Sequence, residues 1–218
     1  MGPGYRSQKT PFENGSLRLY VTIQGVMVGL AGMIHGFAET LQGNRPTEGR
    51  LLVDVGAFTL IPNYLATGIA AILVGLCIVV WTIGFIRTKH GATVFLLLSI
   101  ALFLVGGGIG EAVIFLVAWG VGIQIHQPLT WWRKTLSESF RKQLARGWWL
   151  NFAAGYFFLL VGVALWLVFT PPWIAYEAKS PLMLYLCWAS LLTGLVFQFL
   201  TILSGFARDA QRQTGEIG

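Results

Sequence analysis

Charged residues are scarce in this chain. They make up 11% of its 218 residues, whereas soluble domains average about 25%. A chain with so few charges cannot cover a water-facing surface with polar side chains, and hydrophobic residues reach 55% instead. This composition excludes an ordinary soluble domain and predicts a protein whose surroundings are lipid.

Other absences narrow the class further. Only two cysteines are present, and both lie inside apolar runs, so we expect no disulfide framework. The first ten residues hold no apolar core, so we expect no cleavable signal peptide. The chain has no serine-nucleophile elbow, no His-Glu-x-x-His and no Cys-x-x-Cys motif. The sequence therefore names no reaction and leaves undecided whether the protein is an enzyme.

Long apolar runs are what the chain does have, at about 17–41, 58–86, 92–125, 149–169 and 182–206. They are unbroken rather than alternating, which predicts membrane-spanning α-helices and excludes the strands of a membrane β-barrel. As one helix, the third run would be roughly 50 Å long, against a hydrocarbon core of about 30 Å. Its middle, Gly106–Gly110, is where a helix would break. We therefore expect two short segments, about 92–107 and 110–125, joined at this Gly-rich turn.

The basic residues test that arrangement. With six segments and a cytoplasmic N-terminus, every strongly basic loop falls on the cytoplasmic side, as the positive-inside rule requires. The loops at about 42–57 and 170–181 then lie outside with balanced charge. With five segments, one basic loop, 87–91 or 126–148, is misplaced. The sequence thus predicts an all-α, six-segment transmembrane helix bundle in the cell membrane, with both termini in the cytoplasm.

Three regions are expected along the chain: a mobile cytoplasmic tail at 1–16, a single transmembrane bundle at 17–207 and a cytoplasmic tail at 208–218. The formal net charge is +6. Because the basic residues sit in short loops between apolar runs, membrane topology and anionic lipid headgroups explain them. Nucleic acid is therefore not an expected partner.

The 126–148 loop has the pattern of one amphipathic helix. Apolar side chains recur at a spacing of four from Trp132 to Trp148, and basic side chains lie elsewhere around the helix. We expect this helix, at about 129–147, in the cytoplasmic interface beside anionic headgroups, where it anchors the bundle. Docking of a soluble partner or of specific anionic lipids is the alternative. The residues expected at the lipid surface are Trp131, Trp132, Arg133, Lys134, Arg141, Lys142, Arg146, Trp148 and Trp149.

The first apolar run carries a glycine face, formed by Gly25, Gly29, Gly32 and Gly36. Their spacings of four, three and four place them on one side of a helix. Small residues let another helix approach closely. The neighbour is either another segment of this chain or a second protein, which would make a homo- or hetero-oligomer.

The same run holds His35 and Glu39, one helical turn apart. Glu39 lies near the C-terminal end of its helix, where the dipole disfavours negative charge. It therefore needs protonated His35, Arg45 or a bound cation as a partner, or it keeps a proton. Glu111 follows the Gly-rich turn at the start of a helix, where acids are favoured.

Six segments would place His35, Glu39 and Glu111 at one level near the outer leaflet, with Gln42 and Asn63 as supporting polar groups. Such a set suits a divalent metal ion, and equally a proton-transfer pair. In an enzyme, His35 or Glu39 would act as metal ligand or general base, and Glu111 as second ligand or acid.

The leading hypothesis is a membrane protein with an outer-leaflet cation- or proton-binding site, used for transport or for chemistry on a lipid-soluble substrate. The alternative is a non-catalytic membrane subunit or scaffold that assembles with partner helices or anionic lipids. The first hypothesis requires His35 and Glu39 for activity, whereas the second requires them for assembly.

Overall fold

The computed structural model describes residues 13–52, 57–169 and 180–215. Four of its helices are long and apolar enough to cross a membrane, which confirms the prediction of an α-helical membrane protein at that level. Two shorter apolar helices, α3 (Gly91–Leu104) and α4 (Ile109–Gly122), lie between them in sequence. The four long helices are α1 (Gly15–Thr40), α2 (Tyr64–Gly84), α7 (Trp148–Phe169) and α8 (Pro181–Arg212).

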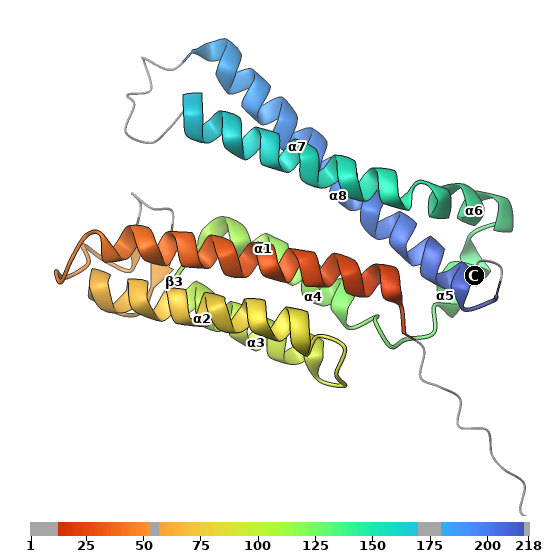
Figure 1. Cartoon of the computed structure of the whole chain (residues 1–218), viewed down its shortest axis with the longest axis horizontal. Coiled ribbons are helices and arrows are strands. Elements are labelled where there is room, and N and C mark those ends of the chain that lie inside the picture. Colours follow the sequence, from red (N-terminus) through yellow and green to blue (C-terminus); the bar gives the residue numbers. More distant parts are fainter. Residues whose placement is uncertain (1–12, 53–56, 170–179, 216–218) are drawn as a thin grey trace, which may run out of the picture.

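The chain reverses direction between α3 and α4, as predicted, so these two helices run antiparallel (Figure 1). Far from the reversal, a methyl group on Gly122 of α4 would come within 3.2 Å of Ala92 Cβ on α3. The residues that join the helices, Val105–Gly108, form strand β3 rather than a turn. Glycine permits this link because Gly106 has a φ of +104°, which other residues rarely adopt.

A three-stranded antiparallel sheet, in the order β1-β2-β3, departs from the all-α prediction. Ala57 pairs with Gly108 across the sheet, and Thr67 of α2 donates a hydrogen bond of 2.8 Å to Val105 O. The prediction missed the sheet because such short strands leave no alternating pattern in the sequence. The other two strands are β1 (Leu51–Leu52) and β2 (Ala57–Thr59).

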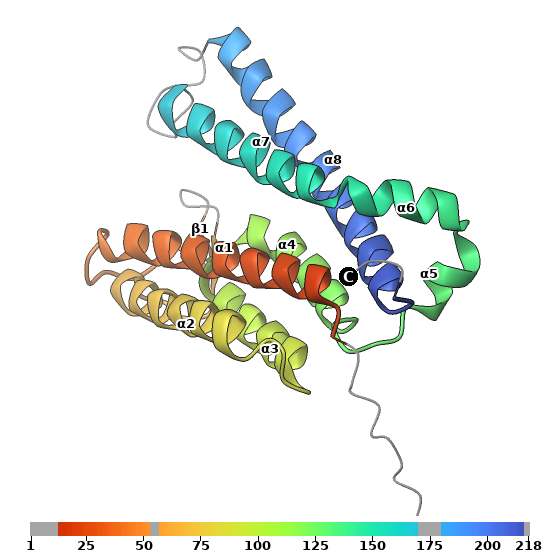
Figure 2. The same cartoon turned by 45° about the vertical axis from the view of Figure 1, so that its right-hand side comes forward.

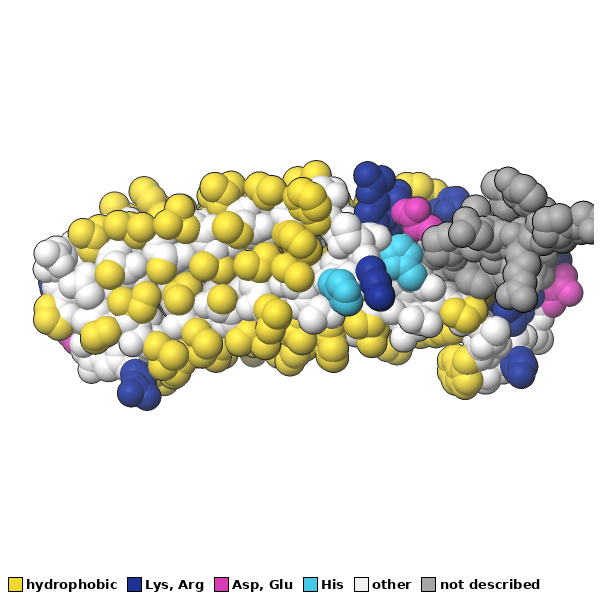
Figure 3. Space-filling view, turned by 90° about the horizontal axis from the view of Figure 1, so that it is seen from below, with side chains coloured by type: hydrophobic (Ala, Val, Ile, Leu, Met, Phe, Trp, Pro, Cys, Tyr) yellow, Lys and Arg dark blue, Asp and Glu magenta, His cyan; other side chains and the backbone are white. Residues whose placement is uncertain are grey.

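We call the end of the bundle that holds this sheet the sheet end. The opposite end, the basic end, holds the start of α1, the 85–90 link, the short helices before α7 and the end of α8. In the space-filling view, apolar side chains cover the long flank of the molecule, and most Lys, Arg and His side chains gather toward the basic end (Figure 3). An apolar flank with a basic end fits a protein embedded in a bilayer.

The glycine face of α1 packs inside the chain, and all four of its glycines are buried. A methyl group on Gly29 would come within 2.6 Å of the Gly75 carbonyl oxygen on α2. One on Gly36 would come within 2.6 Å of the Gly68 carbonyl oxygen. Of the two neighbours considered from the sequence, the structure therefore shows the internal one. The glycine face is not open to a second protein, so an oligomer through this face is not supported.

Gly75→Ala is expected to lower the free energy of unfolding by about 1–3 kcal/mol, because overpacking a close helix contact forces the backbones apart. Gly84→Ala makes the same change at the end of α2, where a methyl group would contact nothing within 4 Å, and should leave stability nearly unchanged. Denaturant unfolding of the detergent-purified protein measures both. Equal stability of the two variants would contradict the close packing of α1 on α2.

Helices α7 and α8 form a hairpin that meets the bundle near the basic end and diverges from it toward the sheet end (Figures 1 and 2). Small residues bring the two helices together, with Gly162 against Leu191 and Gly194 against Leu159. Ser190 Oγ adds a hydrogen bond to a carbonyl oxygen of α7 at 2.8 Å. The hairpin therefore has its own internal packing and contacts α1 through α8.

The predicted interfacial helix is in fact two helices, α5 (Thr130–Thr135) and α6 (Glu138–Arg146). The break falls at Leu136, whose backbone is extended, and Ser137 caps α6 by accepting a hydrogen bond from Phe140 N. A serine at this position satisfies a backbone N–H that has no partner within the helix. The local capping preference therefore overrides the apolar spacing of four that runs across the break.

Two residues expected at the lipid surface are buried instead, so the prediction is wrong for them. Trp148 is 1% exposed and Arg141 is 6% exposed. Helix α8 covers α6 and the start of α7, and the Arg208 guanidinium lies over the Trp148 ring, 4.8 Å from its centroid. Trp131 and Trp149 are exposed.

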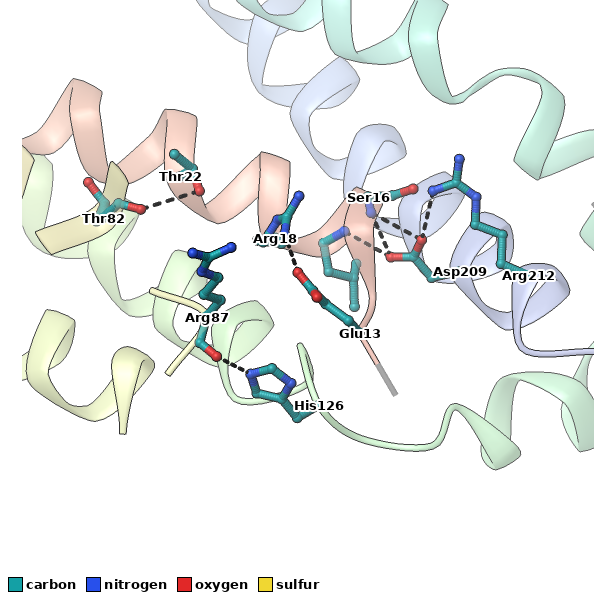
Figure 4. A network of polar contacts seen from close by, with 10 residues as sticks. Glu13, Ser16, Arg18, Thr22, Thr82, Arg87, His126, Asp209 and Arg212 are labelled. Carbon is teal, nitrogen blue, oxygen red and sulfur yellow. Dashed lines mark hydrogen bonds and ion pairs between the residues drawn. The ribbon is translucent and has the colours of Figure 1, made fainter. Parts of the chain in front are cut away.

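Both ends of the described chain are fixed at the basic end. Asn14 and Asp209 are each 1% exposed. The Asp209 carboxylate accepts hydrogen bonds of 2.9–3.0 Å from backbone N–H groups in the first turn of α1 (Figure 4). The bundle thus extends beyond the predicted limits of 17–207, and the predicted tails are too long. Residues 1–12, 53–56, 170–179 and 216–218, which include parts of those tails and of the predicted outer loops, lie outside the described residues.

Candidate functional site

The three ionisable residues singled out in the sequence lie at the sheet end. His35 and Glu39 are near the end of α1, and Glu111 is in the first turn of α4. The reversal at β3 brings α4 back along α1, so that His35 Nε2 lies 3.3 Å from Glu111 Oε1. An imidazole and a carboxylate from separate segments therefore form a pair.

The side chains of these three residues lie against one face of strand β3, which we call the glycine floor. Alternate residues of a strand point to the same face, and on this face Gly106 and Gly108 carry no side chain. A methyl group on Gly106 would overlap the Glu39 carboxyl group and lie 2.6 Å from its Oε1. A methyl group on Gly108 would overlap the Glu111 carboxylate and lie 2.5 Å from His35 Nε2. The two glycines thus make room for two acids and an imidazole.

Glu39 is the most enclosed of the three residues, with an exposed fraction of 0%. Neither of its carboxyl oxygens has a hydrogen-bond partner among the residues that the structure describes. Burying an ionised carboxylate without a donor or a cation costs several kcal/mol. In this arrangement the Glu39 carboxyl group therefore carries a proton or takes up a cation.

The His35–Glu111 pair is more open than Glu39. The two side chains are 29% and 12% exposed. Glu111 stands in the first turn of α4, where the backbone N–H groups favour a negative charge. Histidine changes its charge near neutral pH, so this pair has the chemistry to exchange protons with the surroundings.

The metal-site hypothesis lacks its third ligand. Within residues 13–52, 57–169 and 180–215, no three His, Cys, Asp or Glu side chains come together so that they could hold a metal ion. Glu39 lies against Gly106, whereas the His35–Glu111 pair lies against Gly108, further along β3. The sequence predicted a common level for the three residues and could not resolve this separation along the strand. The arrangement suits proton exchange better than metal coordination.

The two residues expected to support the site use their side chains in other hydrogen bonds. Gln42 lies beyond the end of α1 and accepts a hydrogen bond of 2.8 Å from Arg45. Asn63 caps α2, where its side chain accepts a hydrogen bond of 3.0 Å from Ala66 N. Both residues were assigned by their level along the bundle, which does not fix the direction of a side chain. Arg45 donates to Gln42 rather than to Glu39.

A second polar cluster, which the sequence did not reveal, joins α1 to the hairpin. Gln24 Nε2 donates hydrogen bonds to Tyr20 Oη at 3.1 Å and to Gln198 Oε1 at 3.3 Å. Gln24 and Gln198 are 174 residues apart in the chain, so no local spacing links them. Interhelical hydrogen bonds of this kind hold membrane helices together, and we assign the cluster that role.

The candidate site thus consists of a sealed carboxyl group and a more open imidazole–carboxylate pair on a glycine floor. A fold alone does not assign a function, so the chemistry of these side chains carries the interpretation. No family model, no curated protein and no solved structure matches this chain.

Proposed function

We propose that the protein crosses the cell membrane six times, with its sheet end outside and both termini in the cytoplasm. Helices α3 and α4, each of 14 residues and roughly 20 Å long, would be two short crossings that meet at β3. The positive-inside rule supports this orientation, because Arg18, Arg87 and Lys89 lie at the basic end with the basic residues of α5 and α6.

Within this topology, the site is best suited to take up a proton from the outer side of the membrane and to release it again. The proton would serve transport or chemistry on a lipid-soluble substrate. The observation that carries this proposal is the Glu39 carboxyl group, buried without a hydrogen-bond partner among the described residues. It lies one helical turn from His35, the distance at which side chains of a helix meet. The His35–Glu111 pair would exchange protons with the outside and pass them to Glu39. Ionisable groups inside membrane segments are costly and are usually functional.

The basic end would lie among anionic headgroups of the cytoplasmic leaflet. Trp131 and Trp149 are exposed there, as are Lys142 and Arg146 of α6. Aromatic rings favour the headgroup level, and basic side chains are attracted by the negative charge of that leaflet. The short helices α5 and α6 would thus anchor the bundle.

Infrared spectroscopy of the protein in lipid nanodiscs at neutral pH tests the proton site. The wild type is expected to show a carboxylic-acid C=O band that shifts in D₂O, because Glu39 carries an exchangeable proton. Glu39→Gln is expected to remove this contribution. Glu138→Gln makes the same chemical change on a side chain that is 63% exposed, and should keep the band. A band of unchanged intensity in Glu39→Gln would overturn the proposal.

The alternative, a non-catalytic subunit whose polar groups hold helices together, predicts a different outcome in the same experiment. Its Glu39 proton would be static, so the band would be present but would not exchange with D₂O. In the proposed function, His35→Ala slows that exchange by roughly 100-fold, the usual contribution of a positioned acid–base group. In the alternative, His35→Ala lowers stability and leaves exchange unchanged.

A further inference from the structure

A cavity of about 540 Å³ lies at the basic end, at the opposite end of α1 from the proton site. Its walls come from the start of α1, the end of α2 with the residues that follow it, and the end of α8. Each of these three parts contributes one arginine: Arg18, Arg87 and Arg212. These segments are far apart in the sequence, so the folded chain is what brings three guanidinium groups around one cavity.

The positive charge around this cavity is only partly neutralised. Arg18 forms an ion pair with Glu13, and an Arg212 nitrogen lies 3.9 Å from Asp209. The Asp209 carboxylate is at the same time held by N–H groups of α1 (Figure 4). Arg87 has no carboxylate partner among the described residues. Three guanidinium groups therefore face two carboxylates, one of which is already bound elsewhere.

Three apolar side chains form part of the remaining walls, together with Gly15, Thr22 and Gly84. Leu19, Ile83 and Ile86 line the cavity beside the arginines. The side chains of Arg18 and Arg212 are 40% and 41% exposed, so a ligand can reach the guanidinium groups from outside. A cavity with guanidinium groups next to apolar side chains fits a ligand that carries a phosphate next to hydrocarbon.

We infer that this cavity binds the phosphate group of an anionic lipid. The guanidinium fork matches the phosphate oxygens in geometry and in charge. Leu19, Ile83 and Ile86 offer contacts to the glycerol and the first acyl carbons. A zwitterionic lipid brings its own ammonium group and so gains less from the unneutralised Arg87. A free phosphate offers the same polar chemistry but makes no use of the apolar walls. The inference does not depend on the proton site.

Native mass spectrometry of the protein released from nanodiscs tests this inference. With equal amounts of phosphatidylglycerol and phosphatidylcholine, the wild type is expected to retain phosphatidylglycerol preferentially. Arg87→Gln is expected to weaken that retention by about tenfold, the loss expected for one charge-assisted hydrogen bond. It should fold normally, because no described carboxylate pairs with this guanidinium. Lys89→Gln also removes one positive charge, at an exposed position of the same 85–90 link that does not line this cavity, and should retain lipid as the wild type does.

A second arm measures the melting temperature of the detergent-purified protein with inorganic phosphate. Little stabilisation by phosphate, together with the lipid preference above, supports the inference. Stabilisation by phosphate that is lost in Arg87→Gln, without a lipid preference, would overturn the lipid assignment in favour of a soluble phosphate. Equal lipid retention in Arg87→Gln and Lys89→Gln would overturn the site itself, because the attraction would then be diffuse surface charge.

Discussion

Gly108→Ala is expected to slow proton exchange at Glu39 by separating His35 from Glu111, while the fold stays intact. The added methyl group would overlap the Glu111 carboxylate and lie 2.5 Å from His35 Nε2, so the pair must separate. The D₂O exchange of the Glu39 carboxyl band should then slow by roughly 100-fold, as in His35→Ala. Gly108 has no positive φ, so alanine adopts its backbone conformation without strain. Any change in the exchange rate therefore results from the space that the methyl group takes from the neighbouring side chains.

Gly110→Ala is the matched control for this prediction. It makes the same change two residues further along the chain, where a methyl group would contact nothing within 4 Å. Exchange at the wild-type rate is expected. If Gly108→Ala also exchanged at that rate while circular dichroism showed an intact fold, His35 and Glu111 would have no part in proton uptake.

Asp209→Ala is expected to destabilise the protein by about 2–5 kcal/mol, because it removes a buried acceptor from backbone N–H groups that have no substitute. Ser16 N and Leu17 N both donate to this carboxylate, each at 2.9 Å. A negative charge at the start of a helix adds a favourable interaction with the helix dipole, which is lost as well. Tryptophan fluorescence during denaturant unfolding measures the change in the free energy of unfolding.

Glu138→Ala provides the comparison for a carboxylate at the surface. Glu138 forms an exposed ion pair with Lys142, and pairs of this kind contribute less than about 1 kcal/mol. The two variants should therefore differ clearly. An Asp209→Ala protein as stable as Glu138→Ala would show that the link between α8 and the start of α1 contributes little to stability.

The reversal between α3 and α4 could be predicted from the sequence, because the thickness of a bilayer limits the length of a helix. The 92–125 run exceeds that length, and Gly106–Gly110 marks the place where it breaks. Strands β1 and β2 could not be predicted in this way. They have two and three residues, and β1 pairs with β2, which in turn depends on pairing with β3, a tertiary contact.

The sequence contains a helix-start signal at the break between α5 and α6, but the apolar spacing of four continues across it and predicts one helix. Ser137 directly precedes Glu138, and a serine followed by an acid is typical of a helix start. The burial of Arg141 and Trp148 left no such trace, since it depends on α8 lying across them. A spacing pattern describes one helix and carries no information about its neighbours.

For the candidate site, too, the sequence predicts some features, whereas others depend on tertiary contacts. Topology alone placed His35 and Glu111 at one level, and the structure adds their 3.3 Å separation. The position of a residue along the bundle does not fix the direction of its side chain, and the side chains of Gln42 and Asn63 bond to Arg45 and to Ala66 N instead. The glycine floor had a visible pattern, because Gly106 and Gly108 are two residues apart and so share one face of a strand. That pattern has meaning only once the segment is known to be extended.

The contact between Asp209 and Ser16 spans 193 residues, and it has a consequence for biosynthesis. The ribosome synthesises α1 well before α8. Until α8 has been inserted, the first turn of α1 lacks its hydrogen-bond acceptor. A chain that stops before α8 thus carries a helix α1 with an uncapped start, and the arrival of α8 is the step that fixes it.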